Sequence, residues 1–428
     1  MPMKVALLLD VIIPSASAES IAAMRMADAM AELGHDVELI YAEIATRDHS
    51  ASTSLRAHYS TAQGFRMRGV ERLCHSDADR YWADDAIAAV QASGPDLVYT
   101  RSIAVAFLSV HGGFQTILEC HRDIARPKQR HVPWKKRMKW YAGLIALAGR
   151  RAALSLTGRH DELSCLPRLS AGWRLARNNG LDTKSRLFGQ LLAHACLLNV
   201  VVITRPIKDA LVENFSIAPS RVRVVPDAAL VPSSTLAPAW LGGREQAVRV
   251  GYCGHLYPGK GMEIIAAVAP LCPELDFHIV GGTPHDLQLW QDKLSGIANV
   301  VFHGRVTPAS TPRYLKAFDI CLLPNQEKVA THGNPNDDIG RFTSPLKMFE
   351  YMAAGKPIIA SDLPVLREVL VHDENAILCP HDDPAAWAKQ LTRLADDPDR
   401  RALLGRRAYA ECVKNYTWLA RARAVLAA

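Results

Sequence analysis

Short apolar runs alternate with helical segments along the first half of the chain. A run at residues 5–10 is followed by a helical segment at 19–33 and a second run at 37–41. Further runs rich in β-branched residues occupy 96–100, 116–120, 199–204 and 221–226. Apolar strands separated by helices are typical of a parallel sheet that helices cover on both faces. Residues 43–85 and 121–195 show no such pattern and indicate insertions.

The second half repeats the alternation more cleanly, after a stretch rich in Pro, Ser and Gly at 230–246. Its six apolar runs are "VRVGYC", "DFHIVG", "NVVFHG", "DICLLP", "KPIIAS" and "NAILCP", separated by helical segments near 261–269, 284–296, 310–318, 344–354 and 384–397. Two doubly wound domains are therefore predicted, at 1–232 and 247–412. A linker at 233–246 joins them, and a helix at 413–428 is expected to pack back on the first domain. Ligands of open α/β sheets bind at the carboxyl ends of the strands, so the cleft between the domains is the expected site.

The composition adds that the chain is globular and mildly basic. Its 428 residues are 49% hydrophobic and 22% charged, with a formal net charge of +7. So small an excess of positive charge disfavours nucleic acid as a partner. The nine cysteines include no Cys-x-x-Cys pair, which favours free thiols in a reducing compartment. No cluster of His, Cys and acidic residues suggests a metal site.

The first residues, "MPMKVALLLDVIIPSASA", imitate a signal peptide. Asp10 interrupts the apolar run, however, and the basic region is a single Lys, so we predict the first core strand here. No apolar run reaches the roughly 18 residues that a membrane-spanning helix needs. A cytoplasmic protein is therefore expected.

The stretch "GHLYPGKGMEI" begins at Gly254 and departs from a P-loop only where Ser or Thr is replaced by Gly261. A P-loop holds Mg²⁺ with that hydroxyl, so hydrolysis of a nucleotide is not expected. Gly254, Gly259 and Gly261 would let the backbone approach a ligand, and a helix predicted to start next offers unpaired N–H groups. Lys260 adds a full positive charge and His255 a donor. This combination indicates a pyrophosphate site, with a structural turn as the alternative.

The stretch "RFTSPLKMFEYMAAGKPIIAS" predicts a helix at 345–354. Ser344 is the expected N-cap, Pro345 the first helical residue, and Gly355 lies just past the end. The N–H groups at its start suit anions or sugar oxygens. Glu350 stands near the buried face, where a carboxylate needs partners such as ribose hydroxyls. The alternatives are a surface pair between Glu350 and Lys347, or a structural role for Glu350 in which it supports the site without touching a ligand.

These motifs together carry a resemblance. "GHLYPGKG", "VVFHGRV" and "SPLKMFEYMAAGKPIIAS" occur in the order and spacing of retaining glycosyltransferases of family 4, and the match is strongest over 248–380. The segment "SASAESIAAMRMADAMAELGHDVELI" is similar to the opening helix of that family. The resemblance implies an α/β fold of the GT-B type, in which two Rossmann-like domains face a central cleft. It also implies transfer of a hexose, with retention, from a UDP-sugar or GDP-sugar to a lipid-linked or saccharide acceptor. No metal or other cofactor is implied.

The resemblance assigns roles to individual residues. Lys260 matches the lysine that binds the donor diphosphate, and His121 matches a histidine that faces the donor sugar; both are expected to be catalytic. Glu350 matches the ribose ligand. The other donor-binding positions are Gly254, His255, Gly259, Gly261, Gly304, Arg305, Val306, Thr343, Ser344, Leu346 and Lys347, and the acceptor or phosphate loop holds Ser17 and Ala18. For His121 the alternative is an ordinary loop histidine.

Three positions depart from the family pattern. His255 stands where an arginine is usual, Phe342 where the first of two glutamates is usual, and Ala18 where a glycine is usual. The implied mechanism is electrostatic: Lys260 and two helix N-termini face the charge that builds on the leaving diphosphate. The departures keep two alternatives open, a sugar-nucleotide epimerase or hydrolase of the same fold and a nucleotide-sugar-binding subunit without catalysis.

One further stretch, from Arg126 to Arg151, holds five Arg, four Lys and two Trp but no acidic residue. Basic and aromatic residues beside an apolar run suit an anionic membrane surface. The alternative is a solvated helix of the first domain. The membrane interpretation predicts an enzyme bound peripherally at the cytoplasmic face, in glycolipid, polysaccharide or glycan assembly.

Overall fold

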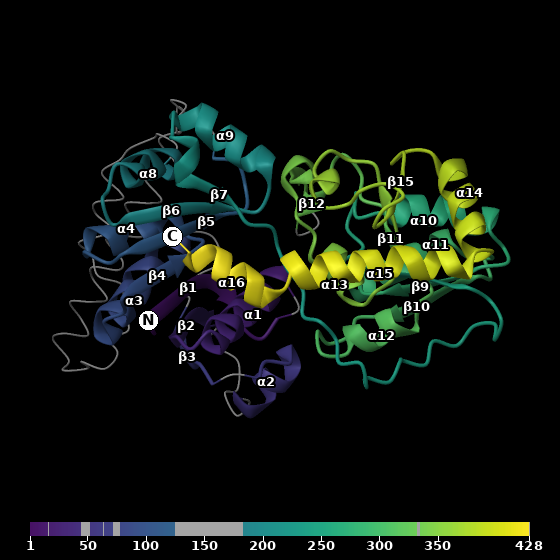
Figure 1. Cartoon of the computed structure of the whole chain (residues 1–428), viewed down its shortest axis with the longest axis horizontal. Helices are drawn as coiled ribbons and strands as arrows, with labels where there is room; N and C mark the ends of the chain where they lie inside the picture. Colours follow the sequence, from purple (N-terminus) through teal and green to yellow (C-terminus); the bar gives the residue numbers. More distant parts are fainter. Residues whose placement is uncertain are drawn as a thin grey trace.

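The computed structural model describes residues 1–15, 17–43, 52–62, 64–71, 78–124, 183–331 and 334–427. In these ranges the chain forms two large parallel sheets that lie side by side, each with its own helices (Figure 1). The prediction of two doubly wound α/β domains is confirmed. The basic stretch at 126–151 lies outside the described residues.

The first sheet has seven strands in the order β3-β2-β1-β4-β5-β6-β7. They are β1 (Lys4–Ile12), β2 (Asp36–Glu43), β3 (Arg66–Glu71), β4 (Leu97–Thr100), β5 (Thr116–Cys120), β6 (Leu197–Val202) and β7 (Val222–Val224). Along β1, Val5, Leu7 and Leu9 belong to one hydrophobic cluster, and Ala6 and Leu8 belong to another. Alternate side chains of a strand point to opposite faces. Both faces of β1 are therefore buried, which explains its continuous apolar run.

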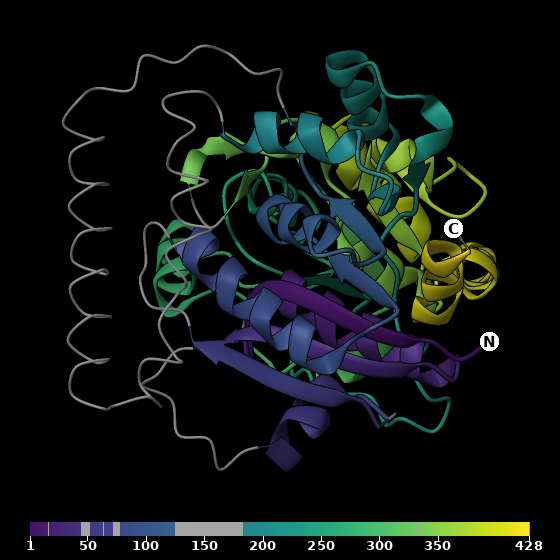
Figure 2. The same cartoon turned by 90° about the vertical axis from the view of Figure 1, so that its left-hand side faces the viewer.

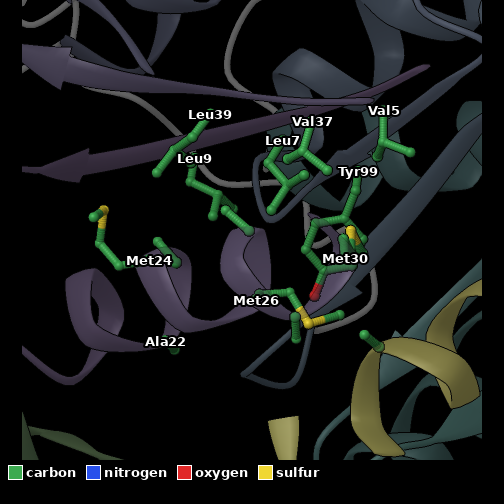
Figure 3. Close-up of a cluster of buried hydrophobic side chains, with 14 of the residues drawn as sticks. Val5, Leu7, Leu9, Ala22, Met24, Met26, Met30, Val37, Leu39 and Tyr99 are labelled. Atoms are coloured by element: carbon green, nitrogen blue, oxygen red, sulfur yellow. The ribbon is translucent and has the colours of Figure 1, made fainter. Parts of the chain in front are cut away.

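Helix α1 (Ala18–Glu32) covers one face of this sheet. Met24, Met26 and Met30 of the helix share a buried cluster with Leu7 and Leu9 of β1 (Figure 3). The flexible thioether side chains fill the gaps between helix and strands. The other helices of this domain are α2 (Ser52–Tyr59), α3 (Ala78–Ser93), α4 (Ile103–His111), α8 (Thr183–Leu192) and α9 (Arg205–Phe215), with the short 3-10 turn η1 (Pro219–Arg221).

The second sheet has six strands in the order β10-β9-β8-β11-β14-β15. They are β8 (Arg249–Cys253), β9 (Asp276–Val280), β10 (Val300–Gly304), β11 (Ile320–Leu323), β14 (Ile358–Ser361) and β15 (Ile377–Cys379). Its helices are α10 (Met262–Val268), α11 (Pro284–Lys293), α12 (Thr311–Ala317), α13 (Leu346–Ala353), α14 (Pro384–Ala395) and α15 (Pro398–Asn415), with 3-10 turns η2 (Ala269–Leu271), η3 (Gly340–Phe342) and η4 (Leu366–Glu368). A small antiparallel pair, β12 (Ala330–Thr331) and β13 (Asn334–Asp338), was not expected because its residues carry no apolar alternation.

The last helix, α16 (Trp418–Leu426), returns to the first domain and packs against α1. Figure 1 shows it in yellow continuing from α15, and Figures 1 and 2 place both chain ends on the first domain. The chain crosses between the domains twice, and the crossings are joined because Ala229 N donates to Tyr416 O at 2.9 Å. Since α15 runs on to Asn415, the returning helix begins later than residue 413.

No helix in the part of the chain that the structure describes is both long and apolar enough to span a membrane.

Replacing Ala422 with Asp tests the docking of α16. Ala422 is fully buried in the cluster that includes α1, so the variant places an unpaired carboxylate there. We expect the free energy of unfolding to fall by about 2 to 4 kcal/mol, measured as a lower Tm in thermal unfolding. Arg423→Ala changes the exposed side of the same helix and should leave Tm nearly unchanged. An unchanged Tm for Ala422→Asp would contradict the docked position of α16.

Candidate functional site

The glycine-rich loop joins β8 to α10 at the carboxyl edge of the second sheet. Gly259 and Gly261 have φ of 78° and 115°, which glycine adopts without strain. A Cβ at Gly259 would lie 1.9 Å from the Lys328 carbonyl oxygen, and one at Gly261 would lie 2.3 Å from Cγ of Pro324. The segment after β11 thus requires both glycines for packing. Their predicted part in donor binding stays a prediction.

The backbone N–H groups of this loop largely have partners already. Gly259 N donates to Glu263 Oε1 at 3.1 Å, and Lys260 N donates to Tyr257 O at 3.0 Å. The loop therefore offers a ligand fewer free backbone donors than the sequence suggested. Its remaining capacity to bind an anion lies in side chains.

The loops that follow β8, β9 and β10 are hydrogen-bonded side by side. Gly254 N donates to Val280 O at 2.9 Å, and Gly281 N donates to Gly304 O at 2.8 Å. Gly281 has φ 123°, and a Cβ there would lie 2.0 Å from Gly254 O, so only glycine fits. Gly281 brings the predicted Gly254 and Gly304 to one edge of the sheet. Sequence reasoning missed it, although the Gly-Gly pair directly after an apolar run was a signal.

The side chain of Lys347 reaches the backbone of Lys260 at the loop. Lys347 is buried, and its Nζ donates to the Tyr252 hydroxyl at 2.8 Å and lies 3.5 Å from Lys260 O. Burial and the charge of Lys260 hold the pKa of Lys347 well below its usual range, and burial lowers the pKa of Lys260 to about 8. Neither amine forms an ion pair with a carboxylate among the described residues. The alternative of a surface pair between Lys347 and Glu350 is wrong, because Lys347 points inward at Tyr252.

His255 lies among these positive charges. Its ring stacks on Tyr257 with centroids 4.8 Å apart. Burial, and then the charges of Lys260, Arg305 and Lys347, lower the pKa of His255 to about 4. The imidazole is therefore neutral at pH 7 and offers hydrogen bonding without charge. Arg305, in the loop after β10, is exposed and provides a third cation.

The start of α13 differs from its prediction. Pro345 occupies the N-cap position, and the Ser344 hydroxyl accepts from Asp227 N of the first domain at 3.1 Å instead of capping the helix. An interdomain contact has thus replaced a local one. Gly355 follows the helix with φ 65°, as expected. Thr343, just before Ser344, is buried.

Glu350 and Leu346 line a cavity of about 30 Å³ between the domains, together with Arg25 of α1 and residues of the linker. Burial raises the pKa of Glu350, and the charges of Arg25 and Lys347 oppose that rise. A polar ligand at Glu350 would therefore meet a carboxylate flanked by two cations. A cavity of this size admits water but not a nucleoside.

Phe342, where a glutamate is usual, packs against the hydrophobic cluster of the first domain that includes Ile203 and Ile207. Its carbonyl oxygen accepts from the Thr204 hydroxyl at 3.4 Å. The position serves contact between the domains rather than binding of a sugar hydroxyl. Val306, after Arg305, is half-buried against the core of the second domain.

The first domain contributes a hydroxyl-rich loop after β1. Ser17 is the N-cap of α1 and accepts from Ser20 N at 3.1 Å, while Ala18 is the first residue of the helix. The Ser15 hydroxyl donates to the Ser20 hydroxyl at 2.9 Å. These serines satisfy one another. Close approach of a ligand at Ala18 stays a prediction.

His121 follows β5, and its Nε2 contacts Oε1 of the buried Glu119. Arg101 and Arg421 bind the same carboxylate, each at 2.9 Å. Sequence reasoning missed all three partners. Glu119 was the available signal, because it is the one charged residue of the apolar run "TILEC". In the described ranges, no group of three His, Cys, Asp or Glu side chains could hold a metal ion.

Residues 247–397 match a family model described as glycosyl transferases group 1. The second domain is therefore similar in sequence to group 1 glycosyltransferases. The prediction of an enzyme of the glycosyltransferase class is confirmed at this level.

Curated relatives include other glycosyltransferases. The putative teichuronic acid biosynthesis glycosyltransferase TuaH of Bacillus subtilis is 29% identical over 29% of this chain and 29% of its own. The D-inositol 3-phosphate glycosyltransferase of Streptomyces avermitilis is 24% identical over 89% of this chain and 78% of its own. The phosphatidyl-myo-inositol mannosyltransferase of Mycolicibacterium smegmatis is 28% identical over 45% of this chain and 48% of its own. Two of these three matches span half of the relative or less.

Solved structures resemble nearly the whole chain. HepE of Anabaena in complex with UDP superposes with a TM-score of 0.62 at 13% identity and covers 98% of each chain. Sucrose-phosphate synthase of Thermosynechococcus elongatus superposes with a TM-score of 0.64 at 18% identity and covers 98% of this chain and 96% of its own. At these identities the likeness concerns the fold. It confirms the predicted GT-B architecture.

Replacing Lys347 with Met is expected to stabilise the folded chain at pH 7 by on the order of 1 kcal/mol, because an ammonium group is no longer buried. The folded-state pKa of Lys347 is lowered, so the unmodified chain gains stability as pH rises toward the usual lysine pKa. The advantage of the variant should therefore shrink between about pH 7 and about pH 10. Denaturant unfolding measures both effects. Lys389→Met, at an exposed site, is the control, and a less stable Lys347→Met at pH 7 would contradict the reasoning.

Proposed function

We propose that the chain is a retaining glycosyltransferase that moves a hexose from a UDP-sugar or GDP-sugar to an acceptor hydroxyl. The observation that carries the proposal is the pair of amines at the glycine-rich loop. Lys347 is buried and Lys260 is half-buried, the Lys347 amine lies 3.5 Å from the backbone carbonyl oxygen of Lys260, and neither amine forms an ion pair with a carboxylate in the described chain. Amines in such surroundings are stabilised by an anion, and a diphosphate presents two adjacent anionic groups.

The positive charges lie where the leaving group would gain negative charge. In the transfer, the bond between the anomeric carbon and the phosphate oxygen breaks, and the diphosphate leaves with the electron pair. Lys260, Lys347 and Arg305 stabilise that charge without having to move during the reaction. With retention, the freed phosphate oxygen accepts the proton of the acceptor hydroxyl on the same face. That step requires no nucleophilic side chain.

Glu350 is proposed as the ribose ligand. It stands one turn after Leu346 on α13, the helix that also carries Lys347. A carboxylate accepts hydrogen bonds from two neighbouring hydroxyls, which suits a ribose. Glu350 lines the cavity between the domains, and this position supports the proposal that the two domains enclose the donor.

The comparisons support the classes of donor and acceptor that we propose. A structural neighbour holds UDP-glucose, and relatives are named for inositol phosphate and phosphatidyl-inositol acceptors. We therefore propose a nucleotide-sugar donor, a saccharide or lipid-linked acceptor, and no cofactor. The basic stretch at 126–151 supports a cytoplasmic enzyme that works at an anionic membrane surface.

Binding of UDP or GDP should weaken as pH rises through about 8, because the pKa of Lys260 is lowered to about 8 and a neutral amine no longer pairs with phosphate. Lys260→Met should bind the nucleotide about 10- to 100-fold more weakly at pH 7 and should lose much of this pH dependence. Isothermal titration calorimetry gives both results. Lys389→Met is the matched control. Equal affinity of Lys260→Met and the unmodified chain would overturn the diphosphate assignment.

Glu350→Ala should abolish detectable binding of the nucleotide sugar, whereas Glu374→Ala, at an exposed carboxylate, should not. Binding and turnover are measured with a panel of UDP-sugars and GDP-sugars. Slow release of UDP or GDP from one donor supports transfer. Binding without turnover, even with lipid acceptors from cells, would contradict an enzyme. Unchanged affinity of Glu350→Ala would remove the ribose assignment.

A further inference from the structure

The carboxylate of Glu119 binds three side chains, and one of them, Arg421, is 302 positions away in the sequence. Glu119 lies near the end of β5 and is fully buried. Its Oε1 accepts from Arg101 Nε and Nη2, both at 2.9 Å, and from His121 Nε2. Its Oε2 accepts from Arg421 Nη2 at 2.9 Å. Both oxygens of the carboxylate are thus engaged.

The contact with Glu119 determines which nitrogen of His121 carries the proton. Burial works to raise the pKa of Glu119, but Arg421 and His121 lower it more, so the carboxyl is ionised and only accepts hydrogen bonds. Nε2 of His121 must then be the donor. In the neutral imidazole Nδ1 is consequently the acceptor. The ring is 27% exposed, so a ligand can reach it.

Arg421 joins this carboxylate to the connection between the domains. Its side chain is 1% exposed although it belongs to α16, the last helix of the chain. Besides Glu119, it donates from Nε to Pro226 O at 2.9 Å and from Nη1 to the Tyr99 hydroxyl at 3.4 Å. Pro226 belongs to the segment that leads out of the first domain. One guanidinium group therefore holds β5, this segment and α16 together.

The neighbouring residue extends the network to the second domain. Asp227 N donates to the Ser344 hydroxyl at 3.1 Å, two residues before α13 begins. The carboxylate of Asp227 acts on the Arg101 guanidinium, where it opposes the lowering of the arginine pKa by burial. Hydrogen bonds thus join His121, Glu119 and the two arginines, Arg421 binds the residue before Asp227, and the Asp227 backbone binds Ser344 next to the helix that carries Glu350.

We propose that Arg421 is a positioning residue, which acts through Glu119 to hold His121 with Nδ1 as the acceptor for a hydroxyl of the bound donor sugar. This proposal rests on the proposed glycosyl transfer. It makes the sugar-facing side of the first domain depend on the docking of α16. An arginine at position 421 is required because a single fork of donors reaches the carboxylate and Pro226 O together.

Kinetics of Arg421→Met test the proposal. Transfer should lose about 10- to 100-fold in kcat through misplacement of His121, while binding of UDP or GDP at Lys260 and Lys347 is unchanged. His121→Asn should lose a similar factor, and the double variant should lose no more than His121→Asn alone. Losses that multiply in the double variant would overturn the proposal, since they would show that Arg421 acts independently of His121. Arg423→Met, on the exposed side of α16, is the control and should match the unmodified enzyme.

Nitrogen chemical shifts of His121 test the proposal without relying on activity. Two-dimensional spectra of protein with ¹⁵N-labelled histidine, assigned with His121→Asn, should show protonated Nε2 and unprotonated Nδ1. Glu119→Gln keeps the volume of the side chain and serves if Arg421→Met fails to fold. Both variants should give mixed tautomers, and a ring that stays in one tautomer would overturn the proposal. If no donor supports transfer, the proposed function fails while these spectra still decide the role of Arg421.

Discussion

The ion pair between Arg421 and Glu119 connects two residues that are 302 positions apart, and the relation between the domains depends on it. Breaking a buried pair leaves an uncompensated charge in the interior, which is strongly destabilising. Helix α16 is therefore held on the first domain. Both crossings between the domains are fixed at the same place, since Ala229 N donates to Tyr416 O and Arg421 holds Pro226 O. Both crossings also lie next to the cavity that Glu350 lines, since Ala229 and Trp418 line it too.

In the second domain, by contrast, the amines of Lys260 and Lys347 have no carboxylate partner among the described residues. Lys347 is buried and Lys260 is half-buried, and burial lowers the pKa of both amines. A hydrophobic residue at 347 would pack more favourably, so stability does not account for the lysine. Under the proposed function, a bound anion would supply both amines with the counter-charge that they lack among the described residues. Burial, and then the same charges, lower the pKa of His255 to about 4, so its ring is neutral at pH 7 because of its surroundings.

The regular elements could be predicted from the sequence because they are local. Apolar runs, glycines with positive φ such as Gly355, and the alternation of strand and helix each depend on a few neighbouring residues. The errors arose where a distant residue decided the outcome. The sequence predicts Ser344 as an N-cap, but in the structure its hydroxyl accepts a hydrogen bond from Asp227 N. The sequence also allows Lys347 to form a surface pair, but in the structure its amine donates to the Tyr252 hydroxyl. Arg421 lies in an ordinary basic helix, and nothing near it in the sequence indicates that its partner is Glu119. Residues 126–151 stay a prediction.

Phe342 and His255 are two positions at the site that depart from the family pattern, and one argument about charge explains both. A glutamate at 342 would add a negative charge near the donor, and an arginine at 255 would add a positive one, so losing both leaves the balance of charge unchanged. Phe342 gains contact with Ile203 and Ile207 in the first domain. Lys347 provides a second amine at the loop, beside Gly254, where a Cβ would lie 3.4 Å from its Nζ. The site therefore combines a buried amine at Lys347 with an interdomain contact at Phe342. Under the proposed function, this combination would suit a donor that is held by its diphosphate, with less recognition of the sugar by carboxylates.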